Sequence, residues 1–196
     1  MEIVAHRINL IKELNSVPIK YGCEIDIRSQ GSNLILNHEP YTSGDFLVDY
    51  LDNYKHGMLV LNIKEAGIEN DVLKFVRERN ITSFFLLDVE FPYLYRASRE
   101  GERAIAVRFS EDEPIELVHN YNELVDWVWI DTNTKLPISE ENLKVLSLMK
   151  TCIVCPERWG RPDEIITYRK SMKKMGFKPD AVMTNLKYTQ LWEQDI

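Results

Sequence analysis

Short apolar runs that stop at polar side chains are the feature of this sequence that most constrains its fold. Runs of roughly four to six apolar residues are typical of strands that are buried in a sheet. The polar residues at which they end are His6-Arg7, Glu24 and Asp26, Asn62 and Lys64, Asp88, Arg108, Asp131, Glu157 and Asn185. Helical patterns separate the runs, and repeated strand–helix units predict a parallel sheet.

Eight such units predict an α/β fold with a single domain over residues 1–196, a compact (β/α)8 TIM-type barrel. The chain is close to the lower size limit of that architecture, roughly 200 residues. An open doubly wound sheet is the alternative, and it too places its chemistry at the carboxyl ends of strands. Because those ends share one rim in a barrel, the polar strand ends predict a functional rim.

The expected elements follow from the period of the apolar pattern and from turn residues. The main strands are expected at 1–5, 23–27, 57–63, 83–87, 103–107, 127–130, 152–155 and 181–183, with a hairpin strand at 33–37. Helices are expected at 9–16, 46–54, 67–79, 93–99, 114–121, 139–149 and 163–175.

The composition favours a cytoplasmic protein without a polyanionic partner. The net charge of −7 and the pI of about 5.2 argue against a nucleic-acid or anionic-membrane surface, which needs a basic face. No apolar stretch approaches the ~18 residues of a membrane span, and Met1 leads into a strand-like run without a secretory leader. The three cysteines are therefore expected to be reduced. On a strand Cys152 and Cys155 point to opposite faces, so we expect a structural role for them.

The run Glu24-Ile25-Asp26 gives the first indication of chemistry. Residues i and i+2 of a strand point to the same side, so both carboxylates are expected to face one site. Two adjacent carboxylates repel, and a divalent cation is the simplest compensation. Ion pairs with Arg7, Lys64 or Arg108 are the alternative.

Taken together, these residues resemble the glycerophosphodiester phosphodiesterase family, which belongs with the phosphatidylinositol-specific phospholipase C-like barrels. The resemblance rests on His6-Arg7, Glu24-x-Asp26, His38 and the strand that ends at Lys64. It is strongest to a small bacterial branch whose members are often found near surface-polysaccharide genes. The matching segments of that branch span nearly the whole chain: LNIK at 61–64, Leu87-Asp88, RFSE at 108–111, WID at 129–131 and CPE…GR at 155–161.

The resemblance implies a phosphoric diester hydrolase or lyase that acts on a small-molecule diester. His6 and His38 are its implied general acid/base pair. Glu24 and Asp26 are its implied ligands of a divalent cation, Mg²⁺ or Ca²⁺, with Asn62 at the third metal position. The expected phosphate-binding and rim residues are Arg7, Lys64 and Arg108 for the phosphate and Asp88, Asp131 and Glu157 around the rim.

Two departures from the family's pattern bear on activity. Ile8 stands where the larger family has a glycine after His-Arg, and the segment that follows is short. Asn62 stands where the third metal ligand is acidic; its carbonyl oxygen suits a hard cation, but it adds no charge.

Two hypotheses follow. The leading one is a metal-dependent phosphodiesterase that cleaves a small glycerol- or sugar-phosphate diester by His/His acid–base catalysis. The alternative is a catalytically weak or inactive barrel that binds a phosphorylated sugar in surface-polysaccharide metabolism. The sequence leaves open the substrate alcohols, the choice of metal and the oligomeric state.

Overall fold

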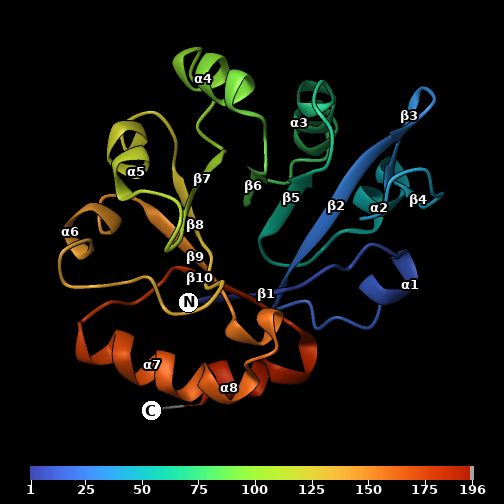
Figure 1. Ribbon diagram of the computed structural model, residues 1–196. Helices are drawn as coiled ribbons and strands as arrows, with labels where there is room; N and C mark the ends of the chain where they lie inside the picture. The colour runs from blue at the N-terminus through green and yellow to red at the C-terminus, as the bar shows by residue number, and fades with distance from the viewer. Residues whose placement is uncertain (195–196) are drawn as a thin grey trace. The chain divides into compact units, whose positions relative to one another are not determined.

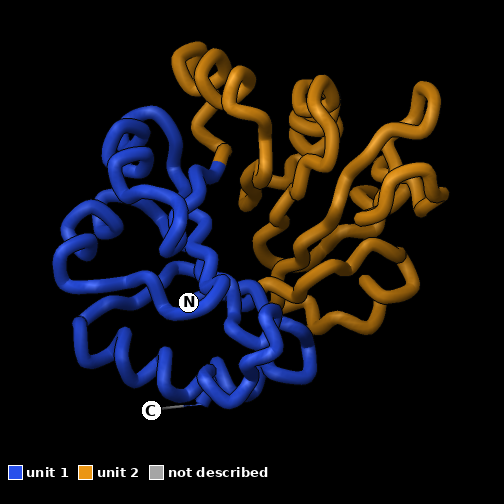
Figure 2. Tube along the Cα trace, in the orientation of Figure 1, with its two compact units in different colours: residues 1–3, 106–196 blue, residues 4–105 orange. Residues whose placement is uncertain are grey.

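The computed structural model describes residues 1–194, which form two compact units (Figure 1). One unit comprises Val4–Ile105, and the other comprises Met1–Ile3 together with the described residues from Ala106 to Gln194 (Figure 2). We call them the amino-terminal and carboxy-terminal units. The prediction of a single domain over 1–196 stays a prediction.

The amino-terminal unit is built on parallel strands paired in the order β1-β2-β5-β6. Their bounds are β1 Glu2–Ala5, β2 Gly22–Gln30, β5 Leu59–Ile63 and β6 Phe84–Leu87. Val4 and Ala5 are the β1 residues of this unit, and a single bridge from Leu86 to Ile105 lies at the other edge. All of β5 is buried, which explains why its sequence reads as a continuous apolar run up to Asn62.

Helices and a hairpin complete this unit. The helices are α1 Ile11–Leu14, α2 Leu47–Asn53, α3 Glu69–Glu78 and α4 Phe91–Arg99. Val72 and Val76 of α3 are fully buried, as the helical spacing predicts. The far half of β2 pairs antiparallel with β3 (Asn33–Leu36), which in turn pairs with β4 (Asp45–Phe46).

Close backbone approach explains Gly22 at the start of β2. A Cβ atom added there would lie 2.1 Å from the carbonyl oxygen of Met58, at the start of β5. Only glycine lets the two backbones come this close, so Gly22 sets where the β2–β5 pairing begins. The register of that pairing decides which side chains meet further along the two strands.

The carboxy-terminal unit repeats the same plan with parallel strands in the order β7-β8-β9-β10. The strands are β7 Ala106–Phe109, β8 Trp127–Ile130, β9 Lys150–Val154 and β10 Ala181–Thr184. Its α-helices are α5 Ile115–Tyr121, α6 Leu143–Leu146, α7 Ile165–Lys174 and α8 Thr189–Glu193. Three short 3₁₀ helices also occur within residues 1–194: Pro156–Trp159, Pro162–Glu164 and Leu186–Tyr188.

The α/β class and the alternation of parallel strands with helices confirm the predicted (β/α)8 order. In each unit every new parallel strand pairs beside the preceding one. A doubly wound sheet instead reverses its strand order at a switch point, so neither unit supports that alternative.

Three differences from the expected elements stand out. Strand β7 runs from Ala106 to Phe109 rather than over 103–107, so Arg108 lies within the strand instead of beyond its end. Helix α6 covers only Leu143–Leu146, because Asn142, rather than Ser139, occupies its N-cap position. Helix α8 has no counterpart among the expected elements.

Within residues 1–194 no helix combines the length and the apolar character that crossing a bilayer requires. The predicted cytoplasmic location stays a prediction.

All three cysteines are buried, which sets their reactivity. Cys23, Cys152 and Cys155 have no solvent-exposed surface. Burial raises the pKa of the Cys23 thiol to about 12 and also raises the pKa of Cys152 and of Cys155. The thiolate is the reactive form, so these side chains behave as small apolar residues.

We therefore expect the native protein to leave a disulfide reagent such as Ellman's reagent unreacted at mildly alkaline pH. A guanidinium-unfolded sample should react at all three cysteines and serves as the control. Rapid labelling of one or more thiols in the native protein would contradict the burial of these side chains and the structural role assigned to them.

Candidate active site

A pair of buried carboxylates on β2 is the centre of the candidate site. Glu24 and Asp26 are each 1% exposed. The backbone N–H of Arg7 donates to Glu24 Oε2 at 2.8 Å, and Arg7 Nε lies 3.6 Å from Asp26 Oδ2. One residue therefore contacts both carboxylates, which confirms that the two point to the same side of β2.

The neighbouring strand β5 supplies an amide and an ammonium group to the same pair. Asn62 lies directly opposite Asp26 in the strand register. Asn62 Nδ2 donates to Glu24 Oε1 at 2.9 Å, and Lys64 Nζ lies 3.2 Å from Asp26 Oδ1. The predicted third metal position and the predicted phosphate-binding lysine thus both lie beside the carboxylates.

Strained backbone accompanies these contacts. Arg7 follows β1 with a φ of 56°, and Asp88 follows β6 with a φ of 58°, both in the left-handed region. Asp88 Oδ2 lies 3.8 Å from Lys64 Nζ. Non-glycine residues adopt this region at a conformational cost that folded proteins concentrate at functional sites.

Asn9 also belongs to the site, although the sequence pattern did not predict it. Its Nδ2 donates to Asp26 Oδ2 at 2.8 Å, and its Oδ1 accepts from the backbone N–H of Asp26 at 2.8 Å. The amide of Asn9 therefore fixes both the backbone and the side chain of Asp26. An amide two residues after the His-Arg pair was the only local sign of it, because the pairing depends on how the loop after β1 folds over β2.

Burial governs the acidity of Glu24. Removal from water is the largest cause that raises the pKa of this carboxyl, and the negative charge of Asp26 adds to it; the net result is a pKa of about 7. The hydrogen bonds from Asn62 and from the Arg7 N–H, and the positive charge of Lys64, act in the opposite sense.

The two predicted catalytic histidines occupy different settings. His6, at 17% side-chain exposure, has Nε2 4.0 Å from Glu24 Oε2 and so borders the carboxylate pair. His38 follows β3, is 36% exposed at its side chain, and has Nδ1 2.7 Å from Glu39 Oε1. A carboxylate on Nδ1 favours the tautomer in which Nε2 can exchange a proton with a substrate.

The oxygen atoms of this cluster fit a hard divalent cation. No group of three or more His, Cys, Asp and Glu side chains within residues 1–194 is arranged to hold a metal. However, Asn62 Oδ1 is buried and has no hydrogen-bond partner among residues 1–194, while Nδ2 of the same amide donates to Glu24. An orphaned amide oxygen together with two carboxylates is a ligand set of the kind that Mg²⁺ and Ca²⁺ accept.

The remaining predicted rim residues lie in the carboxy-terminal unit and bond to their own surroundings. Arg108 pairs with Asp131, which directly follows the next strand β8, and Arg108 Nε lies 2.7 Å from Glu113 Oε1. Glu157 Oε1 accepts from the Asn185 N–H at 2.7 Å. These contacts tie strand ends to one another, which is the structural role that salt bridges at a rim can serve.

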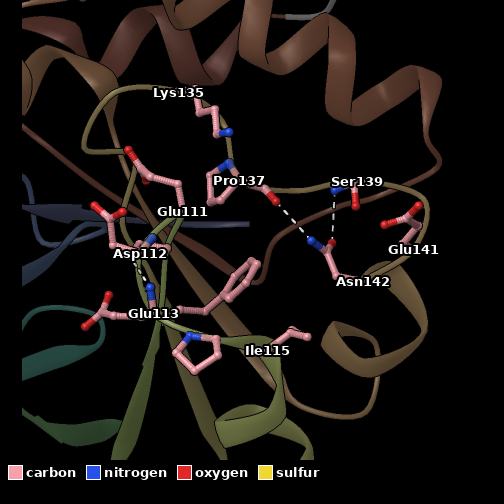
Figure 3. Close-up of a pocket in the computed structure, with 12 residues that line it drawn as sticks. Glu111, Asp112, Glu113, Ile115, Lys135, Pro137, Ser139, Glu141 and Asn142 are labelled. Atoms are coloured by element: carbon pink, nitrogen blue, oxygen red, sulfur yellow. Dashed lines mark hydrogen bonds between the residues drawn. The ribbon is translucent and has the colours of Figure 1, made fainter.

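A separate cavity of about 400 Å³ lies between the loops that follow β7 and β8 (Figure 3). Glu111, Asp112 and Glu113 come from the first loop, and the second brings Lys135 and Asn142. Polar groups of these residues form hydrogen bonds within and between the two loops: Glu111 Oε1 accepts from Thr134, and Asn142 Nδ2 donates to the Pro137 carbonyl. None of the predicted site residues lines this cavity.

Solved structures share this fold. A scan against protein families finds no match for the sequence, and no curated protein matches it. One similar structure, from Agrobacterium tumefaciens and described as a glycerophosphoryl diester phosphodiesterase, has a TM-score of 0.67 at 9% identity and covers 98% of each chain. Another, a glycerophosphodiester phosphodiesterase of the same organism, has a TM-score of 0.66 at 13% identity, with 99% of this chain and 100% of the other covered. The resemblance predicted from the sequence is thus confirmed in three dimensions: this chain has the fold of glycerophosphodiester phosphodiesterases.

Proposed function

We propose that the protein is a metal-dependent phosphodiesterase that cleaves a small glycerol- or sugar-phosphate diester. The observation that carries this proposal is the cluster around Glu24 and Asp26. Side chains from β5 and from the segment that follows β1 reach this one buried pair, and Asp88, which follows β6, contacts Lys64. The fold shared with proteins described as glycerophosphodiester phosphodiesterases supports the choice of a phosphodiester as substrate.

The basic side chains are suited to hold the phosphate. A phosphodiester carries one negative charge, and further charge develops on its oxygens in the transition state. Arg7 and Lys64 stand at the carboxylate pair, and their side chains are 38% and 15% exposed. A substrate phosphate can therefore share these cations with Asp26, and positive groups already in place lower the barrier without reorganisation.

The histidines are suited to move the protons of the reaction. One imidazole takes the proton of the attacking hydroxyl, and the other gives a proton to the leaving alcohol. Glu39 on Nδ1 of His38 orients that ring. His6 borders a carboxylate as well, with its Nε2 4.0 Å from Glu24 Oε2.

Glu24, Asp26 and Asn62 are the residues that would hold the cation. When bound, Mg²⁺ or Ca²⁺ supplies Lewis-acid stabilisation of charge on a phosphate oxygen. Asn9 keeps Asp26 in place through the two hydrogen bonds of its amide. Only two of these ligands carry charge, so the affinity for metal is expected to be weak.

One observation favours the second candidate function, a weakly active or inactive barrel that binds a phosphorylated sugar. Arg7 and Lys64 already lie within ion-pair distance of Asp26. The two cations balance the two carboxylates without a metal, which suits binding of a phosphate group as well as its cleavage.

Turnover of a diester separates the two functions. The purified protein is assayed with bis(p-nitrophenyl) phosphate and with glycerophosphodiesters, with Mg²⁺, Ca²⁺ or Mn²⁺ added or with a chelator. Metal-dependent release of product supports the phosphodiesterase. Saturable binding of a sugar phosphate without turnover under any of these conditions favours the binding protein.

Replacement of either histidine tests the proton-transfer roles. His6→Ala and His38→Ala should each lower turnover by on the order of 10²–10⁴-fold, the usual loss when a positioned acid or base is removed. The melting temperature should change little, because both side chains are partly exposed. His119→Ala, at an exposed position of α5, is the matched control and should keep full activity. Undiminished turnover in either of the first two variants would disprove its role.

Asn62→Asp tests the third metal position. A third carboxylate should tighten metal binding, while the metal-free variant should lose stability because Glu24 loses a donor and gains a negative neighbour. Metal titration by calorimetry and melting curves with and without metal measure both effects. The control Asn120→Asp adds the same charge at an exposed position of α5. Equal metal affinity in wild type and Asn62→Asp would show that Asn62 does not border the cation.

A further inference from the structure

Arg28 extends the row of polar side chains on β2 beyond the carboxylate pair. It lies two residues after Asp26, so strand alternation places it on the same side as Asp26 and Glu24. The pairing of β2 with β5 ends at Ile27 and Ile63, and β2 continues alongside β3, where Arg28 lies opposite Ile35. Arg28 is therefore the first residue of β2 beyond its pairing with β5, in the part of β2 that pairs with β3. Its side chain is 17% exposed.

The guanidinium of Arg28 donates to two backbone carbonyls. Its Nε and Nη2 donate to the carbonyl oxygen of His38 at 3.1 and 2.9 Å. Its Nη1 donates to the carbonyl oxygen of Lys64 at 3.3 Å and lies 3.9 Å from Glu65 Oε2. One planar group thus joins the segment after β3 to the segment after β5.

These bonds complete the anchoring of both segments to β2. The N–H of Lys64 donates to the Ile27 carbonyl at 3.0 Å, so Lys64 is held by β2 at both its N–H and its C=O. The N–H of Asn37 donates to the Asp26 carbonyl at 3.0 Å, one residue before the carbonyl that Arg28 holds. The backbone at His38 is thereby fixed relative to the carboxylate pair.

We propose that Arg28 is a positioning residue that sets the separation between the acid/base His38 and the phosphate-binding Lys64. The inference rests on the proposed function of those two residues. The hydrogen bonds of Arg28 go to backbone carbonyls, so it acts on the reaction through the residues that it holds. A displacement of about 1 Å between catalytic groups is enough to lower a rate on the order of 10²-fold.

The geometry requires an arginine at this position. The donors of a guanidinium lie in one rigid plane, and Arg28 uses three of its nitrogens on two carbonyls. A lysine ammonium is a single donor group and cannot reach the carbonyls of His38 and Lys64 at the same time. Arg28→Lys therefore keeps the charge and most of the stem but loses one of the two carbonyl contacts.

Kinetics of Arg28→Lys give the first test, with bis(p-nitrophenyl) phosphate as substrate. We expect kcat to fall about 10–100-fold, as for other residues that orient a reactive group. Arg79→Lys is the matched control: Arg79 uses Nε on Asp52 and Nη1 on the Phe75 carbonyl, at a similar exposure of 20%. Both variants should melt at a lower temperature, but only Arg28→Lys should lose kcat.

A second readout does not depend on turnover. Nuclear magnetic resonance follows the His38 imidazole through a pH titration, and calorimetry measures the affinity for inorganic phosphate. In Arg28→Lys the His38 ring signals should shift and phosphate should bind more weakly, while Arg79→Lys should resemble wild type in both. Arg28→Met, which also removes the charge, should show larger changes; if it fails to fold, Arg28→Lys carries the test.

The outcomes separate this inference from the proposed function. Absence of turnover in the wild type overturns the phosphodiesterase, and the His38 signals and phosphate affinity then decide the role of Arg28. If Arg28→Lys leaves the His38 signals unchanged, Arg28 does not position His38 and the inference fails. It also fails if Arg79→Lys changes these signals as much as Arg28→Lys, because the effect is then general loosening of the unit.

Discussion

The burial of two like charges on one strand is the constraint on which the rest of the candidate site depends. Glu24 and Asp26 are almost wholly removed from water, and an uncompensated buried carboxylate is strongly unfavourable. Hydrogen-bond donors and a cation compensate the two carboxylates. The Arg7 N–H and the Asn62 amide donate to Glu24, and the Asn9 amide and the Lys64 ammonium contact Asp26. A bound cation would add to this compensation at Asn62 Oδ1, which has no hydrogen-bond partner in the described part of the chain, residues 1–194.

In the proposed function, the groups that stabilise the fold are also the ones that hold the phosphate. Lys64 neutralises Asp26 while its side chain stays partly accessible, so its charge can be shared with an anion that binds there. The backbone N–H of Arg7 donates to Glu24, and its side chain lies near Asp26. Arg7 makes both contacts with its backbone in the left-handed conformation. Strain at Arg7 and Asp88 is tolerated because the contacts around the carboxylate pair outweigh it.

Much of the fold and part of the site could be predicted from local pattern. The strand–helix alternation and the common facing of Glu24 and Asp26 depend only on the period of the chain, and the structure confirms both. The bounds of β7 and the length of α6 were wrong: β7 runs from Ala106 to Phe109 and so includes Arg108, and Asn142 takes the N-cap position of α6. The assigned roles of His6, His38 and the metal ligands stay predictions, because each concerns a substrate or ion and not the fold.

The sequence by itself determined the order of elements and the residue types that β2, β5 and the segments after β1 and β6 offer to one site. Those properties are local, because side chains alternate along a strand whatever lies beside it. Only the tertiary structure decided the partners: Asn62 for Glu24, Lys64 for Asp26, and the carbonyls of His38 and Lys64 for Arg28. Such pairs are set by the register of strands that lie far apart in the chain, and a shift of one residue would have turned each side chain to the opposite face.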